Sequence, residues 1–142
     1  MGVAIAVQNI STVVGDDEVR KALPALQHQA NYHFAPFWHA EARLFYFPKD
    51  QKPPAGMWRA EIRDDTVDAA FGEHATDPEH DVPDLVVGAA ADIEAGIEWT
   101  VTFSHELLEC LADPWINACA QVDDDMPTAR VWCRQPYGRL AS

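Results

Sequence analysis

The stretch Trp99-Thr-Val-Thr-Phe-Ser-His-Glu-Leu-Leu-Glu-Cys-Leu-Ala-Asp-Pro-Trp115 decides the fold of this 142-residue chain. Its apolar residues recur at helical spacing, which predicts an amphipathic helix over 99–112. Pro114 disfavours the α conformation at Asp113, so the helix should end there. Residues four apart on such a helix lie about 40° apart around its axis, so His105 and Glu109 share a face.

The chemistry of this helix rests on His105-Glu-Leu-Leu-Glu109, which has the spacing of the zinc-peptidase pattern HExxH with glutamate at the second histidine. We expect His105 and Glu109 to bind one cation from the same helix face. Glu106 lies about 100° round from His105 and is the expected general base. The alternative is an ordinary amphipathic helix on which Glu106 and Glu109 are solvated and the histidine is incidental.

A zinc hydrolase needs a third protein ligand, and Asp113 is the favoured candidate. It follows His105 by about 12 Å along an unbroken helix, so it can contribute only if the chain turns back there. The alternatives lie outside the helix: His74, His80, Asp123, Asp124 and Asp125. One histidine with a glutamate and an aspartate is a harder ligand set than two histidines with a glutamate. Mn²⁺ and Ca²⁺ are therefore alternatives to Zn²⁺ as the bound metal.

Four further segments are predicted to be strands, and one is predicted to be a long helix. Short apolar or alternating runs at 3–8, 43–47, 57–63 and 85–89 indicate strands. A helix should begin at Asp16 or Asp17 and end before Pro36. Residues 64–84 are polar and lack a period, so we expect a loop. The chain is long enough for one domain without disulfides.

Composition excludes several classes of partner. The net charge of −13 argues against nucleic acid and anionic membranes, which require a basic surface. No apolar run approaches the roughly 20 residues of a membrane span. The three cysteines are odd in number and show no CxxC spacing, so a disulfide framework and a thiolate zinc site are both disfavoured. We therefore expect a cytoplasmic, reducing environment.

A longer pattern resembles zincin-like metallopeptidase-type proteins of bacterial and phage genomes. Its core is Ser104-His-Glu-Leu-Leu-Glu-Cys-Leu-Ala-Asp-Pro114, preceded by Gly72-Glu73-His74 where similar proteins have a Gly-Tyr-His loop. The run 27–38 resembles their backing helix. The resemblance implies an α+β, zincin-like domain over 1–117, in which a twisted mixed sheet of about four strands packs on a backing helix and an active-site helix. Residues 118–142 would be a short tail, so the C-terminal lobe is reduced.

The resemblance implies two functions. The first is a zinc-dependent peptidase, in which strand 85–89 is the edge strand and binds an extended peptide by adding it to the sheet. The second is a catalytically weak or inactive scaffold, for instance a phage virion component, which the short C-terminal remainder and the glutamate at position 109 favour. Oligomeric or virion assembly is the partner that this second function implies.

Overall fold

Five strands form one mixed sheet in the order β2-β1-β3-β5-β4. They are β1 (Val3–Asn9), β2 (Ala42–Phe47), β3 (Trp58–Arg63), β4 (Gly72–Asp77) and β5 (Val82–Gly88). All neighbours are parallel except β4 and β5, which are antiparallel. This computed structural model describes residues 2–66, 70–77 and 79–116, and the backbone of three later strands. The protein is therefore α+β.

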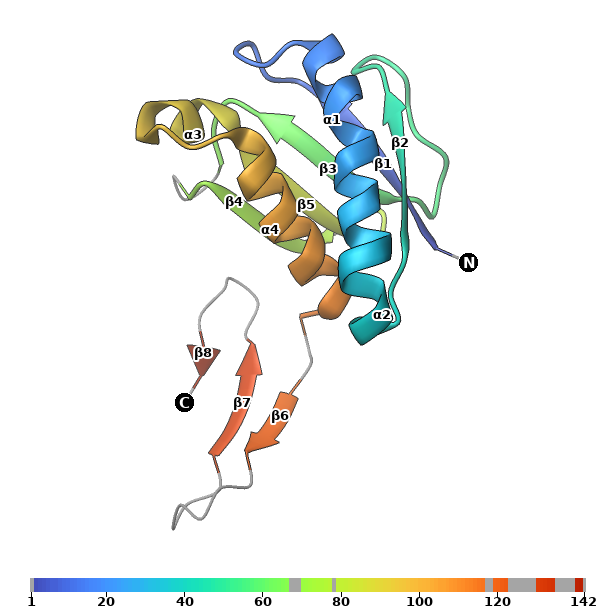
Figure 1. The fold of residues 1–142 in the computed structure, drawn as a ribbon, viewed down its shortest axis with the longest axis vertical. Helices are drawn as coiled ribbons and strands as arrows, with labels where there is room; N and C mark the ends of the chain where they lie inside the picture. The colour runs from blue at the N-terminus through green and yellow to red at the C-terminus, as the bar shows by residue number, and fades with distance from the viewer. Residues whose placement is uncertain are drawn as a thin grey trace.

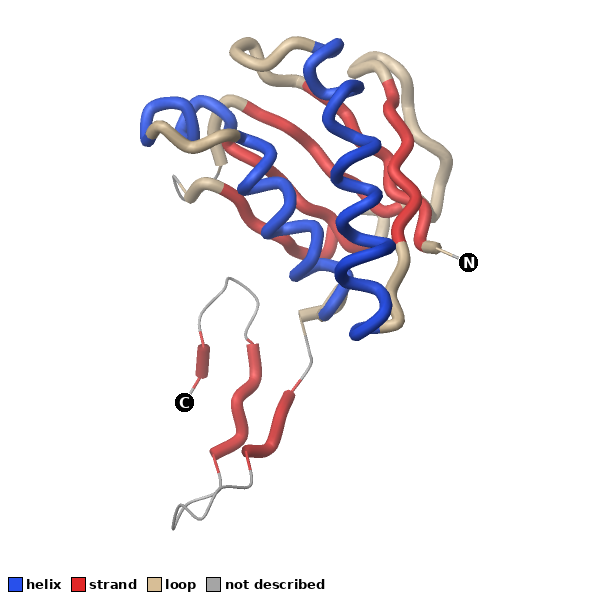
Figure 2. Tube along the Cα trace, viewed as in Figure 1, coloured by secondary structure: helices blue, strands red, loops and turns tan. Residues whose placement is uncertain are grey.

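Two long helical segments cover one face of this sheet (Figure 1). The first is α1 (Asp16–His28), which continues through a π-helical turn, η1 (Gln29–Phe34), into α2 (Ala35–Trp38). The second is α4 (Trp99–Ala112), preceded by the short helix α3 (Ala89–Ala95). Parallel strands require crossover connections, and the chain between β1 and β2 supplies one through α1. Figure 2 shows the two long helical segments on the same side of the strands.

The core lies between these helices and the sheet. Side chains alternate along each strand, so every second residue faces the helices. The largest buried apolar members are Ile5 and Val7 of β1, Ile62 of β3, Leu85 and Val87 of β5, and Phe103 and Leu107 of α4. Trp99 packs edge-on against Phe103 and donates an indole hydrogen bond to Glu18, which ties α4 to α1.

The prediction of about four strands was wrong by one, because β4 lies in the segment expected to be a loop. Its sequence, Gly-Glu-His-Ala-Thr-Asp, has little intrinsic strand preference. Six residue pairs join it to β5, and α4 packs against it. This segment therefore forms a strand because it pairs with β5 and packs on α4, not because of its own sequence preference.

The same strand corrects the expected edge. Residues 85–89 were expected to be the edge strand, but β5 lies inside the sheet between β3 and β4. Ala89 is not in that strand, because it begins α3. The edge beside α4 is β4. The error follows from reading β4 as a loop, since omitting it leaves β5 as the last strand.

The expected end of the first helix was also wrong. The helical backbone does not stop before Pro36, which lies in the first turn of α2, directly after the π-helical turn. The predicted end of α4 is confirmed, with Asp113 as its C-cap residue.

A separate three-stranded antiparallel sheet contains β6 (Cys119–Val122), β7 (Arg130–Arg134) and β8 (Leu140–Ala141). The alternative ligands Asp123, Asp124 and Asp125 lie outside the described residues. None of the helices in the described part is long and apolar enough to cross a membrane.

A candidate metal centre between β4 and α4

His74 of β4 meets the acidic side chains of α4. It is in register with Leu85, a core residue on the helix-covered face of β5. Paired residues point to the same face of a sheet, so His74 points toward the helices. Its side chain is only 6% exposed, and Glu106 beside it is also buried. The edge strand and the helix thus bring together a histidine and a carboxylate that are 32 positions apart in the sequence.

The distances in this cluster are longer than hydrogen bonds. Nδ1 of His74 lies 3.5 Å from Oε2 of Glu106 and 3.4 Å from Oε2 of Glu109. One ligand atom each from His74, Glu106 and Glu109 lies within 4.8 Å of the others. Two ligands of a tetrahedral cation, each about 2.0–2.2 Å from it, are about 3.3–3.6 Å apart. The two His74–carboxylate separations therefore fit an ion held between the groups.

The packing that sets these distances depends on Gly72. A β-carbon at Gly72 would lie 2.7 Å from Cγ2 of Thr102, 2.7 Å from Cγ of Glu106 and 2.9 Å from its Oε1. Real β-carbons essentially never approach so closely, so β4 lies this near α4 only because residue 72 has no side chain. Gly72 therefore sets the separation between His74 and the helix.

Behind this contact lies a fully buried carboxyl group, Asp92 of α3. Thr102 donates a 2.8 Å hydrogen bond to its Oδ1. Burial raises the pKa of Asp92, and the Thr102 hydrogen bond partly opposes that shift. The same hydrogen bond orients Thr102, whose methyl group contacts Gly72. Asp92 thus supports the packing of β4 on α4.

The remaining side chains of α4 have different surroundings. Ser104, in the middle of the helix, donates a 2.6 Å hydrogen bond to Oε1 of Gln29 and joins α4 to η1. Burial, aided by Asp84 and Glu106, raises the pKa of the Cys110 thiol to about 12. The thiol is therefore protonated near neutral pH and does not supply a thiolate ligand.

The structure brings together some of the residues expected at the site. Nε2 of His105 lies 3.4 Å from Oε1 of Glu109, so these two do share a helix face. The His105 side chain is 66% exposed, and it is outside the group of three. Glu106, expected to be the base, is a member of that group. Asp113 is buried at the end of α4 and is also outside the group.

His74 entered the sequence analysis as one alternative ligand and as part of Gly72-Glu73-His74, which resembles a Gly-Tyr-His loop. Its neighbour Gly72 was the available signal, because a glycine within a polar segment marks a place where another element approaches closely. His80, the other alternative, lies elsewhere: its Nδ1 is 2.7 Å from Oδ2 of Asp77, with which it forms an i,i+3 pair.

Comparison of the chain with protein-family models, curated proteins and solved structures gives no significant match. The geometry of the cluster is therefore the evidence for its chemistry.

Proposed function

We propose that this chain binds one divalent cation through His74, Glu106 and Glu109, and that the site serves hydrolysis of an amide bond in an extended peptide. The observation that carries the proposal is the convergence of the three side chains between β4 and α4. A mixed sheet, a backing helix and an HExxE helix beside an antiparallel edge strand also agree with the zincin-like proteins that the sequence resembles.

The donor atoms favour Zn²⁺ or Mn²⁺. Imidazole nitrogen suits transition metals, and carboxylate oxygen suits Zn²⁺, Mn²⁺ and harder cations. Ca²⁺ takes six to eight oxygen ligands, so a histidine disfavours it. A bound cation would polarise a substrate carbonyl and lower the pKa of a water molecule. Two glutamates also reduce the effective charge of the ion, so we expect slow turnover.

His105 is the residue that we propose to hold and move a proton. It is exposed, and Glu109 lies beside its Nε2, as expected for a base oriented by a carboxylate. Glu106 occupies the buried side of the cluster, where it faces His74. This assignment exchanges the roles expected from the sequence, in which His105 is the ligand and Glu106 the base.

The two assignments predict opposite results for single variants. If His74, Glu106 and Glu109 are the ligands, His74→Ala and Glu106→Gln should each weaken Zn²⁺ affinity by more than about 100-fold, which exceeds the effect of losing an outer-shell partner. His105→Ala should then retain the ion and lose turnover. If His105, Glu109 and Asp113 are the ligands, His105→Ala and Asp113→Ala should lose the ion, and Glu106→Gln should keep it. Glu109→Gln loses it in both cases.

The measurements are isothermal titration with Zn²⁺ and Mn²⁺, elemental analysis of the purified protein, and cleavage of an unstructured peptide library. His33→Ala is the matched control, because His33 is exposed in η1, away from the cluster. Unchanged Zn²⁺ affinity in His74→Ala would contradict our assignment. Absence of stoichiometric binding in the unaltered protein would remove the metal-dependent function altogether.

A second candidate is a non-catalytic scaffold, in which the ion only joins β4 to α4. The burial of Glu106 favours it, because a buried ligand stabilises the contact between strand and helix without needing access to substrate. A rise in melting temperature with Zn²⁺, together with no peptide cleavage at any metal concentration, would distinguish this role from hydrolysis.

A further inference from the structure

The face of the sheet opposite the helices carries a second group of polar side chains. Arg59, Glu61 and Arg63 of β3 alternate with its core residues and point to this open face. The loop after β2 lies against it, because the side-chain amide of Gln8 donates hydrogen bonds to the carbonyl oxygens of Pro48 and Gln51, at 3.0 and 2.9 Å. The loop is thereby fixed beside β1.

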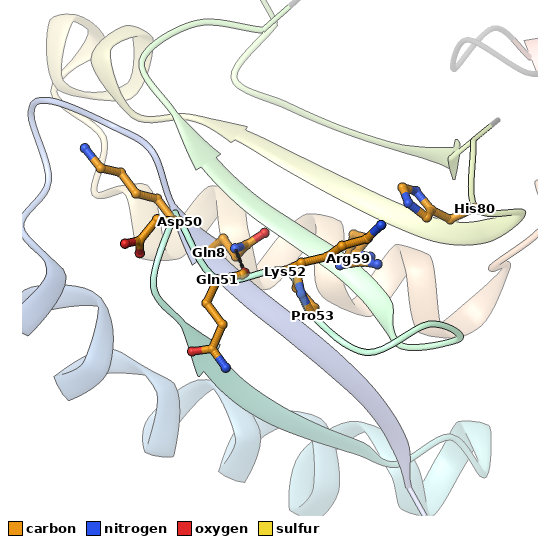
Figure 3. Close-up of a pocket in the computed structure, with 8 residues that line it drawn as sticks. Gln8, Asp50, Gln51, Lys52, Pro53, Arg59 and His80 are labelled. Carbon is orange, nitrogen blue, oxygen red and sulfur yellow. Dashed lines mark hydrogen bonds between the residues drawn. The ribbon is translucent and has the colours of Figure 1, made fainter.

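A hollow of about 290 Å³ lies between this loop and β3 (Figure 3). We call it the basic hollow, because Lys49, Lys52 and Arg59 all line it in a chain with 10 basic and 23 acidic residues. In Figure 3 the helices lie behind the sheet, so the hollow and the α4 cluster are on opposite faces. Its position is therefore independent of the metal centre.

These three basic side chains make no ion pair within 4 Å in the described part of the chain, although Asp84 is the cross-strand partner of Arg59. Arg63 forms an ion pair with Glu61, and Arg20 with Asp17, whereas Lys49, Lys52 and Arg59 form none within the described residues. The Nε of Arg59 is also buried and lacks a hydrogen-bond acceptor there. Buried N–H groups usually have an acceptor, so the guanidinium of Arg59 lacks a hydrogen bond that such a group normally makes.

His80 also lines the hollow. Its Nδ1 lies 2.7 Å from Oδ2 of Asp77, which holds the ring; Nε2 donates to an anion only when both ring nitrogens carry a proton. Asp50, which is exposed, is the one carboxylate among the described residues that line this hollow; Glu61, Asp77, Glu79 and Asp84 line an adjoining one. The lining thus offers cationic donors from a loop and a strand.

We propose that the basic hollow binds the phosphate group of a small molecule. A guanidinium donates two parallel hydrogen bonds to phosphate, and lysines add point charges, which together match a doubly charged oxyanion. The volume suits a small ligand rather than a polymer. The net charge of −13 and the nearby Asp84 oppose an approaching anion; at 0.15 M salt, carboxylates more than about 8 Å away are largely screened.

The test is titration of inorganic phosphate into metal-free, ¹⁵N-labelled protein in 0.15 M NaCl, followed by amide chemical shifts. Metal-free protein keeps the result separate from any binding at His74, Glu106 and Glu109. We expect saturable shifts at Gln8, Lys52 and Arg59, and affinity for singly charged acetate at least about 10-fold weaker. Loss of a charged hydrogen bond should make Arg59→Gln weaken phosphate affinity by about 10-fold or more.

Arg43→Gln is the matched control, because Arg43 is exposed on the open face of β2 but does not line the hollow. Arg43→Gln changes the net charge by the same amount as Arg59→Gln. It should alter phosphate affinity less than about twofold, as expected for a screened remote charge. Lys52→Gln, on the exposed loop, should weaken binding even if Arg59→Gln fails to fold. Shifts that do not saturate, or equal affinity in the Arg43 and Lys52 variants, would overturn the proposal.

Discussion

The two faces of the five-stranded sheet differ in what their alternating side chains do. On the helix-covered face, Ile62 and Leu85 build an apolar core, and His74 at its edge meets two glutamates. On the open face, the same two strands carry Arg59, which lines the basic hollow, and Asp84, its cross-strand partner. A strand period of two therefore lets one short sheet separate a candidate cation site from a candidate anion site.

The comparison is tested most strongly by removing one aromatic ring from each face. Phe103 is fully buried under α4, so Phe103→Ala should lower the free energy of unfolding by about 3–5 kcal/mol through lost burial and a cavity. Phe45 is 40% exposed on the open face of β2, and Phe45→Ala should cost less than about 1 kcal/mol. Urea denaturation measures both. Similar losses would show that the open face is covered in solution.

A smaller effect is expected from the close contact between β4 and α4. Gly72→Ala would place a methyl group against Thr102 and Glu106, so unfolding free energy should fall by about 1–3 kcal/mol. Zn²⁺ affinity should fall with it, because His74 would be displaced from the helix. Gly15→Ala meets no atom within 4 Å and should leave Zn²⁺ affinity unchanged. Titration calorimetry with Zn²⁺ on both variants measures this difference. Unchanged Zn²⁺ affinity in Gly72→Ala would contradict the role assigned to this glycine.

The smallest predicted effect concerns Asp84 and depends on pH. Burial, with nearby Asp77 and Glu73, raises the pKa of this carboxyl to about 6, and Arg63 opposes the shift. The folded state therefore holds the proton more tightly than the unfolded state. The resulting stability is present below pH 4 and is lost as pH rises through about 6.

Asp84→Asn removes this penalty and should stabilise the protein by about 1–2 kcal/mol at pH 7.5, less than the shift alone implies because of solvent screening. The gain should shrink at pH 5, where the native carboxyl is mostly protonated. Asp65→Asn, at an exposed position, is the control for removing one charge. Equal gains at both pH values would show that Asp84 does not titrate as its surroundings indicate.

Local signals in the sequence were sufficient for the elements with strong periodicity. The apolar spacing of 99–112 and Pro114 predicted α4 and its end, and the alternation in 57–63 predicted β3. The spacing of His105 and Glu109 also predicted that they share a helix face, because that follows from helix geometry alone.

Only the tertiary structure decided the partner of that helix. Gly72-Glu73-His74 has weak strand preference, and its conformation comes from pairing with β5 and packing on α4. His74 is 32 positions before Glu106; Gly72 marked a close approach of some element, but no local pattern indicated that this element is α4. The sequence by itself determined which residues carry the candidate chemistry on the helix; the contact between an edge strand and that helix decided which of them converge.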